Sequence, residues 1–281
     1  MDFLPKLCVV FLLSLLVSGP AHAQTPTPNG RVGNADDADS VEGTVISNID
    51  LSRPFSTREA WRFIATQGPL AVGASGSGAD EPGEIQLCLR ATPSAPCDPQ
   101  LLNALDATSS ARFTQPHYLK AVNIVYPRGS VDQPLLFVQT GSLHSGDGSQ
   151  LVLTQVLAYE NSRNRFVRIY QYTTGTNGNE EVRYISSGRL QGDIISVDPT
   201  ENAPYGYWVT VNVLTPQYTY KPVLRYRSAT HYGDNNPLAV IDSEMPNIEQ
   251  RLGYWKSGMA LPLPSGACPR PRLIRMELWC N

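Results

Sequence analysis

Apolar and polar residues alternate along much of the chain after residue 60. Residues 61–66 and 84–90 both show the period-two pattern of a half-buried strand. Further segments rich in Val, Ile, Tyr, Phe and Thr follow at short intervals, with turn residues between them. These segments are residues 121–126, 135–140, 151–159, 166–172, 181–185, 193–197, 207–214 and 223–228. The pattern predicts an all-β protein with antiparallel sheets.

The turns and flanking segments refine this expectation. Residues 174–179 have Asn177-Gly178 near their centre and are typical of a hairpin turn, because Asn-Gly adopts positive φ at low cost. We expect an antiparallel β-sandwich or jelly roll, with a small propeller or barrel as the alternative. One or two short helices should accompany it, over residues 99–111 and after Pro246, where Asn247 can act as the cap.

The first 23 residues have the pattern of a signal peptide. Lys6 precedes an apolar run over residues 7–17, and Ala21-His22-Ala23 is an A-x-A cleavage signal. The run is shorter than the roughly 20 residues that span a bilayer, and no later segment is apolar enough to do so. The sequence therefore predicts an exported, soluble protein, secreted or periplasmic.

The rest of the chain divides by composition. Residues 24–44 have almost nothing to bury and are expected to form a flexible leader. Residues 45–281 are expected to form a single β-rich domain. Its tail, from residue 261 onward, alternates Pro with apolar residues and is expected to lie extended across the domain.

Four cysteines remain once Cys8 is removed with the signal peptide. An even number in an exported chain predicts two disulfides, for which the sequence permits three pairings. The local pairs Cys88–Cys97 and Cys268–Cys280 are favoured because each flanks a short loop that contains proline, and closing such a loop contributes about 3 kcal/mol. Zinc is the disfavoured alternative, since no C-x-x-C spacing is present.

One short motif occurs twice. Residues 144–148 are His-Ser-Gly-Asp-Gly and residues 231–235 are His-Tyr-Gly-Asp-Asn, each followed by apolar residues. The repeat predicts a strand, a polar turn and a second strand, used twice. If both turns lie at the same end of the fold, their side chains could form one polar site.

The two turns offer candidate metal ligands. Asp147 and Asp234 could bind calcium together with backbone carbonyls, or could accept hydrogen bonds from their own backbone in Asx turns, which need no ligand. His144 and His231 could act as a general base or bind a metal if they converge. A histidine in a turn is otherwise simply solvated. No cofactor other than calcium is suggested.

Asp242 and Glu244 are candidate catalytic carboxylates. Residues 239–245 have the pattern of a strand end, on which these two side chains would share one face, about 6.5–7 Å apart. Glycosidases use such pairs, and His231 would complete the catalytic set. The alternative is an ion-paired edge leading into the turn at Pro246.

Aromatic residues suggest a binding surface. The chain has thirteen Tyr and seven Phe, and this excess of Tyr favours partly solvent-exposed rings over fully buried ones. Candidate ligand-binding residues are Tyr205, Tyr207, Trp208, Tyr232, Arg225, Arg227 and His144. The rings could stack on a sugar or a surface partner, although tyrosine is also an ordinary strand residue. The arginines could grip an acidic polysaccharide or form cross-strand ion pairs with Asp242 or Glu244.

The charge distribution and the absent motifs exclude several classes of protein. Residues 24–160 carry 8 basic and 14 acidic side chains, and residues 161–281 carry 13 and 10, which favours docking of one half on the other. No Lys/Arg cluster is dense enough for nucleic acid. The sequence has no phosphate-binding loop, dinucleotide fingerprint, H-E-x-x-H or G-x-S-x-G motif.

Three functions fit these observations. The first is a non-catalytic protein that binds a glycan or a cell-surface partner through its aromatic and polar loops. The second is a secreted polysaccharide-cleaving enzyme, a glycosidase or lyase that uses the carboxylate pair. The third is a structural component of the cell envelope. The absence of a nucleophile motif places binding ahead of catalysis.

Overall fold

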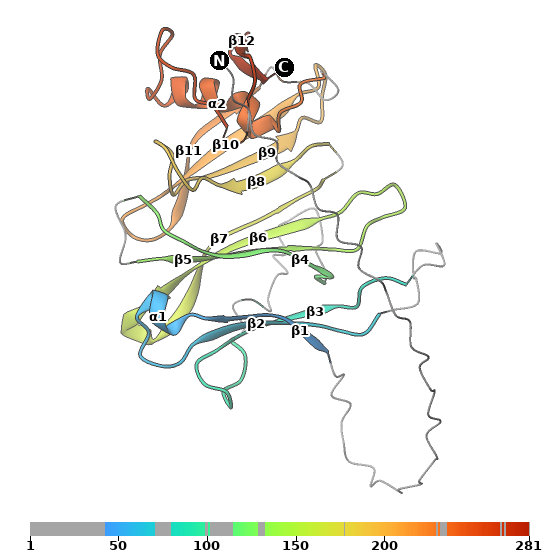
Figure 1. The fold of residues 1–281 in the computed structure, drawn as a ribbon, viewed down its shortest axis with the longest axis vertical. Coiled ribbons are helices and arrows are strands. Elements are labelled where there is room, and N and C mark those ends of the chain that lie inside the picture. The colour runs from blue at the N-terminus through green and yellow to red at the C-terminus, as the bar shows by residue number, and fades with distance from the viewer. Residues whose placement is uncertain are drawn as a thin grey trace, which may run out of the picture. The chain divides into compact units, whose positions relative to one another are not determined.

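The computed structural model describes residues 43–70, 80–98, 101, 115–128, 133–176, 178–228, 230, 235–264, 266 and 268–280 (Figure 1). These residues form antiparallel sheets and two short α-helices, which confirms the prediction of a mostly β, antiparallel protein. The predicted signal peptide, the leader up to residue 42 and almost all of the predicted helix at 99–111 lie outside them.

The predicted strands between residues 61 and 228 all have counterparts within a few residues. The strands are β1 (Thr44–Asp50), β2 (Arg62–Gln67), β3 (Ile85–Arg90), β4 (Tyr118–Val125), β5 (Leu135–Gly141), β6 (Val152–Glu160), β7 (Arg165–Thr174), β8 (Glu181–Tyr184), β9 (Ile194–Pro199), β10 (Tyr207–Leu214), β11 (Tyr220–Arg227), β12 (Pro271–Ile274) and β13 (Glu277–Cys280). The helices are α1 (Ser52–Phe55) and α2 (Val240–Arg251), and a 3-10 turn covers Asn161–Arg163.

Each larger sheet is a meander whose neighbouring strands follow one another along the chain. The first sheet contains β1 to β3, the second β4 to β7 and the third β8 to β11, and a separate hairpin joins β12 and β13. All described pairs are antiparallel. A jelly roll is built from strands in Greek-key order. The described strands do not have this order, so a jelly roll does not fit them.

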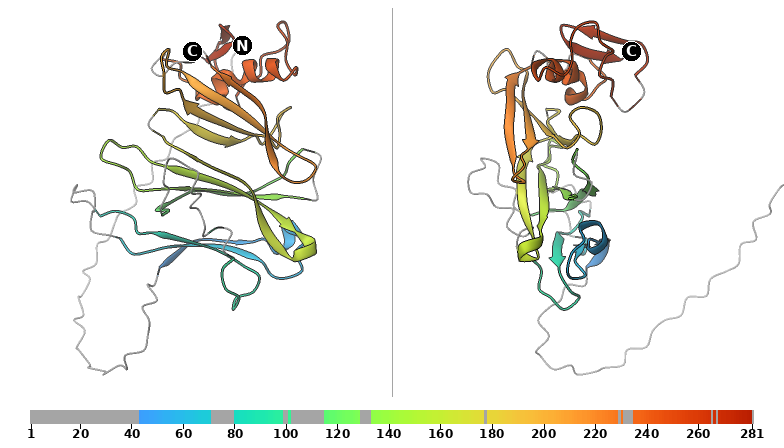
Figure 2. Two further views of the ribbon diagram at one scale, coloured as in Figure 1. Left: turned by 180° about the vertical axis from the view of Figure 1, so that it is seen from behind. Right: turned by 90° about the vertical axis from the view of Figure 1, so that its left-hand side faces the viewer.

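The three sheets lie as successive layers, so the second has a neighbouring sheet on each face (Figures 1 and 2). In β5, Leu136 and Val138 pack in one cluster with Phe63 of the first sheet. Leu135 and Phe137 point the other way and pack with Ile194 of the third sheet. Burial on both faces explains why β5 begins with four consecutive apolar residues rather than an alternating pattern.

Helix α2 replaces the strand end predicted for residues 239–245, and that prediction is wrong. Ile241, Met245, Ile248 and Leu252 recur at intervals of four, three and four, which places them along one side of a helix. This side packs on the outer face of the third sheet. Pro246 lies inside the helix rather than before its start, so Asn247 is not the cap.

The connection at residues 174–179 is not the predicted hairpin turn. β7 belongs to the second sheet and β8 to the third, and β8 pairs with β9 instead. Residue 177 lies outside the described residues. The segment carries the chain from one layer to the next, which a local turn signal does not distinguish from a hairpin.

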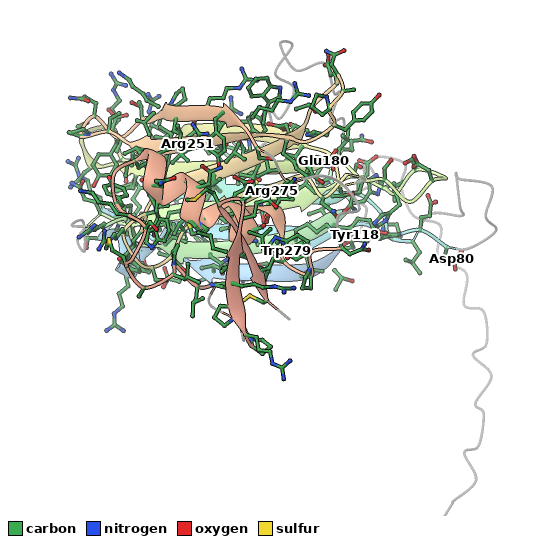
Figure 3. All side chains as sticks on the ribbon, turned by 90° about the horizontal axis from the view of Figure 1, so that it is seen from above. Asp80, Tyr118, Glu180, Arg251, Arg275 and Trp279 are labelled. Atoms are coloured by element: carbon green, nitrogen blue, oxygen red, sulfur yellow. A yellow bond between two sulfur atoms is a disulfide. The ribbon has the colours of Figure 1, made fainter. Side chains whose placement is uncertain are left out.

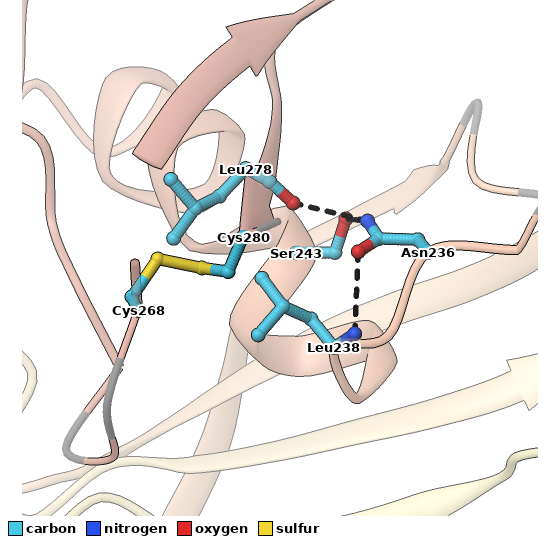
Figure 4. Close-up of a disulfide and its surroundings, with 6 residues drawn as sticks. All are labelled: Asn236, Leu238, Ser243, Cys268, Leu278 and Cys280. Atoms are coloured by element: carbon cyan, nitrogen blue, oxygen red, sulfur yellow. Dashed lines mark hydrogen bonds between the residues drawn. A yellow bond between two sulfur atoms is a disulfide. The ribbon is translucent and has the colours of Figure 1, made fainter. Parts of the chain in front are cut away.

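The end of the chain forms the β12–β13 hairpin, where an extended tail is predicted. The α2 helix and this hairpin form the cap seen from above in Figure 3. Pro271 is the first residue of β12, a position where a missing N–H is tolerated. Asn236 donates hydrogen bonds to Ser243 Oγ (2.8 Å) and to the carbonyl of Leu278 (3.0 Å), so it ties the hairpin to α2 (Figure 4).

Both predicted disulfides are present. Cys88–Cys97 and Cys268–Cys280 have Cα–Cα distances of 4.9 and 5.0 Å, within the usual range. Two disulfides indicate an oxidising, extracytoplasmic compartment. Among the described residues, neither helix has the length and apolar character needed to cross a membrane.

Candidate functional site

Glu244 of α2 is fully buried and receives hydrogen bonds from three side chains. The Tyr226 hydroxyl and the Asn247 amide donate to its Oε2 at 2.6 and 2.9 Å, and the Thr230 hydroxyl donates to its Oε1 at 2.6 Å. Burial and the nearby Glu244 raise the pKa of Tyr226 above its usual range. These bonds fasten α2 to β11, and they leave Glu244 closed to a substrate.

Asp242 points in a different direction and forms an ion pair. Residues two apart on a helix are about 200° apart, so the predicted shared face with Glu244 does not exist. Asp242 Oδ1 accepts from Arg183 Nη1 at 2.6 Å, and Arg183 Nη2 donates to Glu181 Oε2 at 2.8 Å. Burial alone would lower the pKa of Arg183, but the two carboxylates outweigh it and raise that pKa.

A cavity of about 410 Å³, here named the α2 groove, lies beside this ion pair. It is bounded by α2, by the loop between β8 and β9, and by residues 255–264. Its lining includes Asp242, Met245 and Glu249 of α2, Ser186, Ser187 and Arg189 of the loop, and Trp255 and Met259. The three α2 residues are spaced i, i+3 and i+7, so one side of the helix faces the groove.

The α2 groove combines fixed charges with apolar walls. Burial raises the pKa of Glu249, and the charge of Arg189 opposes that shift. Trp255 is 3% exposed and donates from Nε1 to the carbonyl of Ala260 at 2.9 Å. Its ring therefore forms a fixed wall, while Met259 is 42% exposed at the rim.

A second cavity of about 360 Å³, here named the Asp193 groove, shares Arg189 with the first. Its lining includes Arg128, Arg189, Asp193, Thr215, Tyr218 and Tyr254. Burial raises the pKa of Asp193 to about 7. The Tyr184 hydroxyl is buried without a hydrogen-bond partner among the described residues, and burial followed by the charge of Asp193 raises its pKa to about 12.

A third cavity of about 550 Å³ lies between α1, β6, β7 and the turn after β10. Ala158, Val167 and Ile169 give it an apolar floor. None of the residues predicted to carry function lines it in the part of the chain that the structure describes.

The predicted aromatic residues do not form one platform. Tyr207 is 1% exposed and packs in the core beneath α2, so its ring is closed to a ligand. Trp208 is half-buried, and the Arg225 guanidinium lies 4.7 Å from the centre of its ring. Tyr205 is 65% exposed.

Arg225 and Arg227 form no ion pair with Asp242 or Glu244 among the described residues. Tyr226 lies between them and faces α2, so the two arginines project from the opposite face of β11. Arg227 donates to the carbonyls of Asn202 and Pro204. It therefore holds the loop before β10 in place.

The first copy of the repeated motif forms the β5–β6 turn. Asp147 Oδ1 accepts from Ser145 Oγ at 2.6 Å and from the backbone N–H of Ser149 at 3.0 Å. These bonds hold the pKa of Asp147 at about 2 and make an Asx-type turn. His144 is exposed, and its ring centre lies 5.2 Å from that of Tyr118.

The second copy is only partly described. His231, Tyr232 and Asp234 lie outside the described residues, so their predicted roles stay predictions. The strand expected after this copy is wrong, because α2 begins at Val240. Within the described residues, no three His, Cys, Asp or Glu side chains are grouped so that they could hold a metal ion.

The sequence analysis did not identify most of the residues that line the α2 groove and the Asp193 groove. Arg128, Arg189, Asp193 and Glu249 come from segments far apart in the chain, and none is part of a short motif. One signal was available for α2, because the spacing of Asp242, Met245 and Glu249 fits one side of a helix.

Comparison with known proteins gives no relative for this chain. No family model, curated protein or solved structure matches it. Its function is therefore inferred from the geometry of the two grooves.

Proposed function

We propose that this chain is an exported, non-catalytic binding protein that holds a glycan in the α2 groove. The observation that supports this most strongly is the composition of that groove. Arg183 and Asp242 are fixed by their ion pair beside apolar Met245 and Met259. Ligand sites typically combine such apolar walls with a few fixed polar groups.

A sugar matches both parts of this lining. Its hydroxyls can donate to Asp242 and accept from Arg183, whose remaining donors are not all used by carboxylates. Its C–H faces can pack on the methionine side chains. Ser186 and Ser187 add exposed hydroxyls at the rim.

The compartment and architecture are consistent with this role. The disulfides support a secreted or periplasmic location, as the predicted signal peptide does. The packing of sheet on sheet supports a sandwich-type architecture with three layers in place of two, ahead of a propeller or barrel. Loops at the cap end of this stack would then present the ligand site.

Calorimetric titration with a panel of neutral and acidic oligosaccharides tests the proposal. We expect at least one of them to bind, and Ser187→Trp, which fills the α2 groove, to weaken that binding more than tenfold. Ser94→Trp is the matched control, because Ser94 is also exposed and lies in the loop after β3, outside the α2 groove. Equal affinities in both variants would remove the α2 groove as the site.

A secreted polysaccharide-cleaving enzyme is the second candidate, and Asp193 favours it. A carboxyl with a pKa of about 7 in an open groove can donate a proton at neutral pH. Release of new reducing ends from polysaccharides, lost in Asp193→Asn, would support the enzyme. Binding without any release would leave the protein non-catalytic.

A further inference from the structure

The Asp193 groove forms where four distant segments of the chain meet. Arg128 follows β4, Arg189 and Asp193 lie in the β8–β9 loop, Thr215 lies in the turn after β10, and Tyr254 follows α2. No single pair of elements forms this cavity, so its shape depends on the packing of the whole fold.

Two arginines give this groove its charge. Arg128 donates to the carbonyl of Arg189 at 3.4 Å, and Arg189 donates to the carbonyl of Tyr254. Neither arginine forms an ion pair with a carboxylate of the described residues. Each guanidinium has five N–H donors, so most of those donors face the cavity or solvent.

The backbone at Gly192 lies close to the backbone of Pro127 and Arg128, which fixes the position of the Arg128 backbone. Gly192 has φ of +98°, and a Cβ placed there would lie 3.1 Å from Pro127 Cα and 3.2 Å from the Arg128 nitrogen. The Tyr220 hydroxyl donates to the Gly192 carbonyl at 2.8 Å and holds the loop on the third sheet. Glycine at this position therefore allows the segment after β4 to seat on the β8–β9 loop.

The cap, which Tyr254 adjoins just after α2, also exposes cationic side chains. In α2, the β12–β13 hairpin and the described residues between them, the exposed charged side chains are Arg251, Lys256, Arg270, Arg272 and Arg275, two of which are labelled in Figure 3. The acidic residues of the cap are Asp242, Glu244, Glu249 and Glu277, and all four are buried or half-buried. An anion approaching the cap therefore meets mainly positive exposed side chains.

We infer that the Asp193 groove is a subsite for the acidic group of an anionic glycan, held by Arg128 and Arg189. The inference rests on the proposed function, because Arg189 lines both grooves and lets one chain of sugars extend from the α2 groove into the Asp193 groove. Guanidinium groups bind carboxylates and sulfates through paired hydrogen bonds. Asp193 is the one acidic residue in the described lining, so the two arginines outnumber it even when it is ionised.

The observations favour a polysaccharide over an anionic lipid surface. The acidic subsite adjoins a groove lined by serine hydroxyls, an ion pair and methionines, which suits a chain of sugars. A lipid surface would be expected to contact a flat cationic face rather than a pair of cavities.

Calorimetric titration with an oligogalacturonate, and with its carboxyl-reduced neutral form, tests the inference. The measured quantity is the ratio of the two affinities at low salt. We expect the acidic form to bind about tenfold more tightly, and Arg128→Gln to bring the ratio close to one. Lys120→Gln is the matched control, since it removes one exposed cation near the start of β4 and should leave the ratio unchanged.

The other outcomes distinguish the two proposals. Equal binding of both oligomers would overturn the acidic subsite and leave the glycan-binding function in place. No binding of either oligomer, or of any sugar in the wider panel, would overturn both. Binding to phosphatidylglycerol vesicles without binding to the oligogalacturonate would assign the cations to a lipid surface and contradict the inference.

Discussion

Glu244 is fully buried and Asp193 is half-buried, and their surroundings give them different roles. Glu244 receives hydrogen bonds from Tyr226, Thr230 and Asn247. Burial is the cause of the raised pKa of Asp193, which lines an open groove. Glu244 is therefore expected to stabilise the fold, and Asp193 is expected to titrate near neutral pH.

Replacing Glu244 with alanine tests the structural role. The change leaves three donors without this acceptor, two of them buried, so we expect the free energy of unfolding to fall by about 3 kcal/mol. Glu244→Gln keeps one acceptor oxygen and should cost clearly less. Urea denaturation measures both, and a loss below about 0.5 kcal/mol for alanine would contradict the role.

Asp193→Asn tests the raised pKa. The folded carboxyl keeps its proton up to about pH 7, whereas the unfolded one loses it near its ordinary value of about 4. The folded state therefore binds more protons between these values, and the free energy of unfolding falls as pH rises through them. An asparagine does not ionise and escapes this loss.

We expect the asparagine variant to exceed the wild type by about 1 to 2 kcal/mol at pH 8, after allowance for the partial exposure of Asp193. The difference should shrink toward pH 4. Thermal denaturation across this range measures it. A difference that does not change with pH would show that Asp193 titrates normally.

At the scale of elements, the local sequence pattern predicts where strands lie better than it predicts which strands pair with each other. The strand of residues 207–214 matches β10 residue for residue, because alternation is a property of the strand itself. The segment 239–245 fits both a strand and a helix over so few residues. Its helical period appears only when Ile248 and Leu252 are included. The turn at 174–179 shows the same limit, since a turn signal does not specify which strands pair.

The β8–β9 loop depends on a glycine whose conformation can be tested. Gly192→Ala adds a Cβ at φ +98° that meets Pro127, so we expect a loss of about 2 kcal/mol in stability. Gly188→Ala, at φ +78° with nothing within 4 Å, should cost only about 1 kcal/mol. Urea denaturation of both variants gives the comparison. Equal losses would mean that the contact with Pro127 does not constrain the loop.

At the scale of the whole molecule, three consecutive meanders are stacked and capped by α2. The layers join through apolar clusters rather than through the charge difference between the two halves. The excess of basic residues after residue 161 appears instead as exposed cations on the cap and on β11. These exposed cations agree with the anionic glycan that we propose, and the docking expected from the charge difference stays a prediction.

The two grooves could not be predicted from the sequence, because their residues are far apart along the chain. Their members Arg128, Asp193, Asp242 and Tyr254 meet only because the layers stack. The disulfides are the exception, since each links residues close in sequence. The spacing of cysteines along the chain is sufficient to predict those bonds, whereas predicting a groove between layers requires knowing how the sheets pack.

Hydrogen–deuterium exchange with and without a saturating oligogalacturonate tests most directly the claim that the α2 groove binds a glycan. Peptides from residues 183–190 and 255–264 should gain protection, because they form two walls of that groove. The loop at residues 91–98 should not change. Protection confined to other parts of the chain, or absent while the sugar binds, would contradict the assignment.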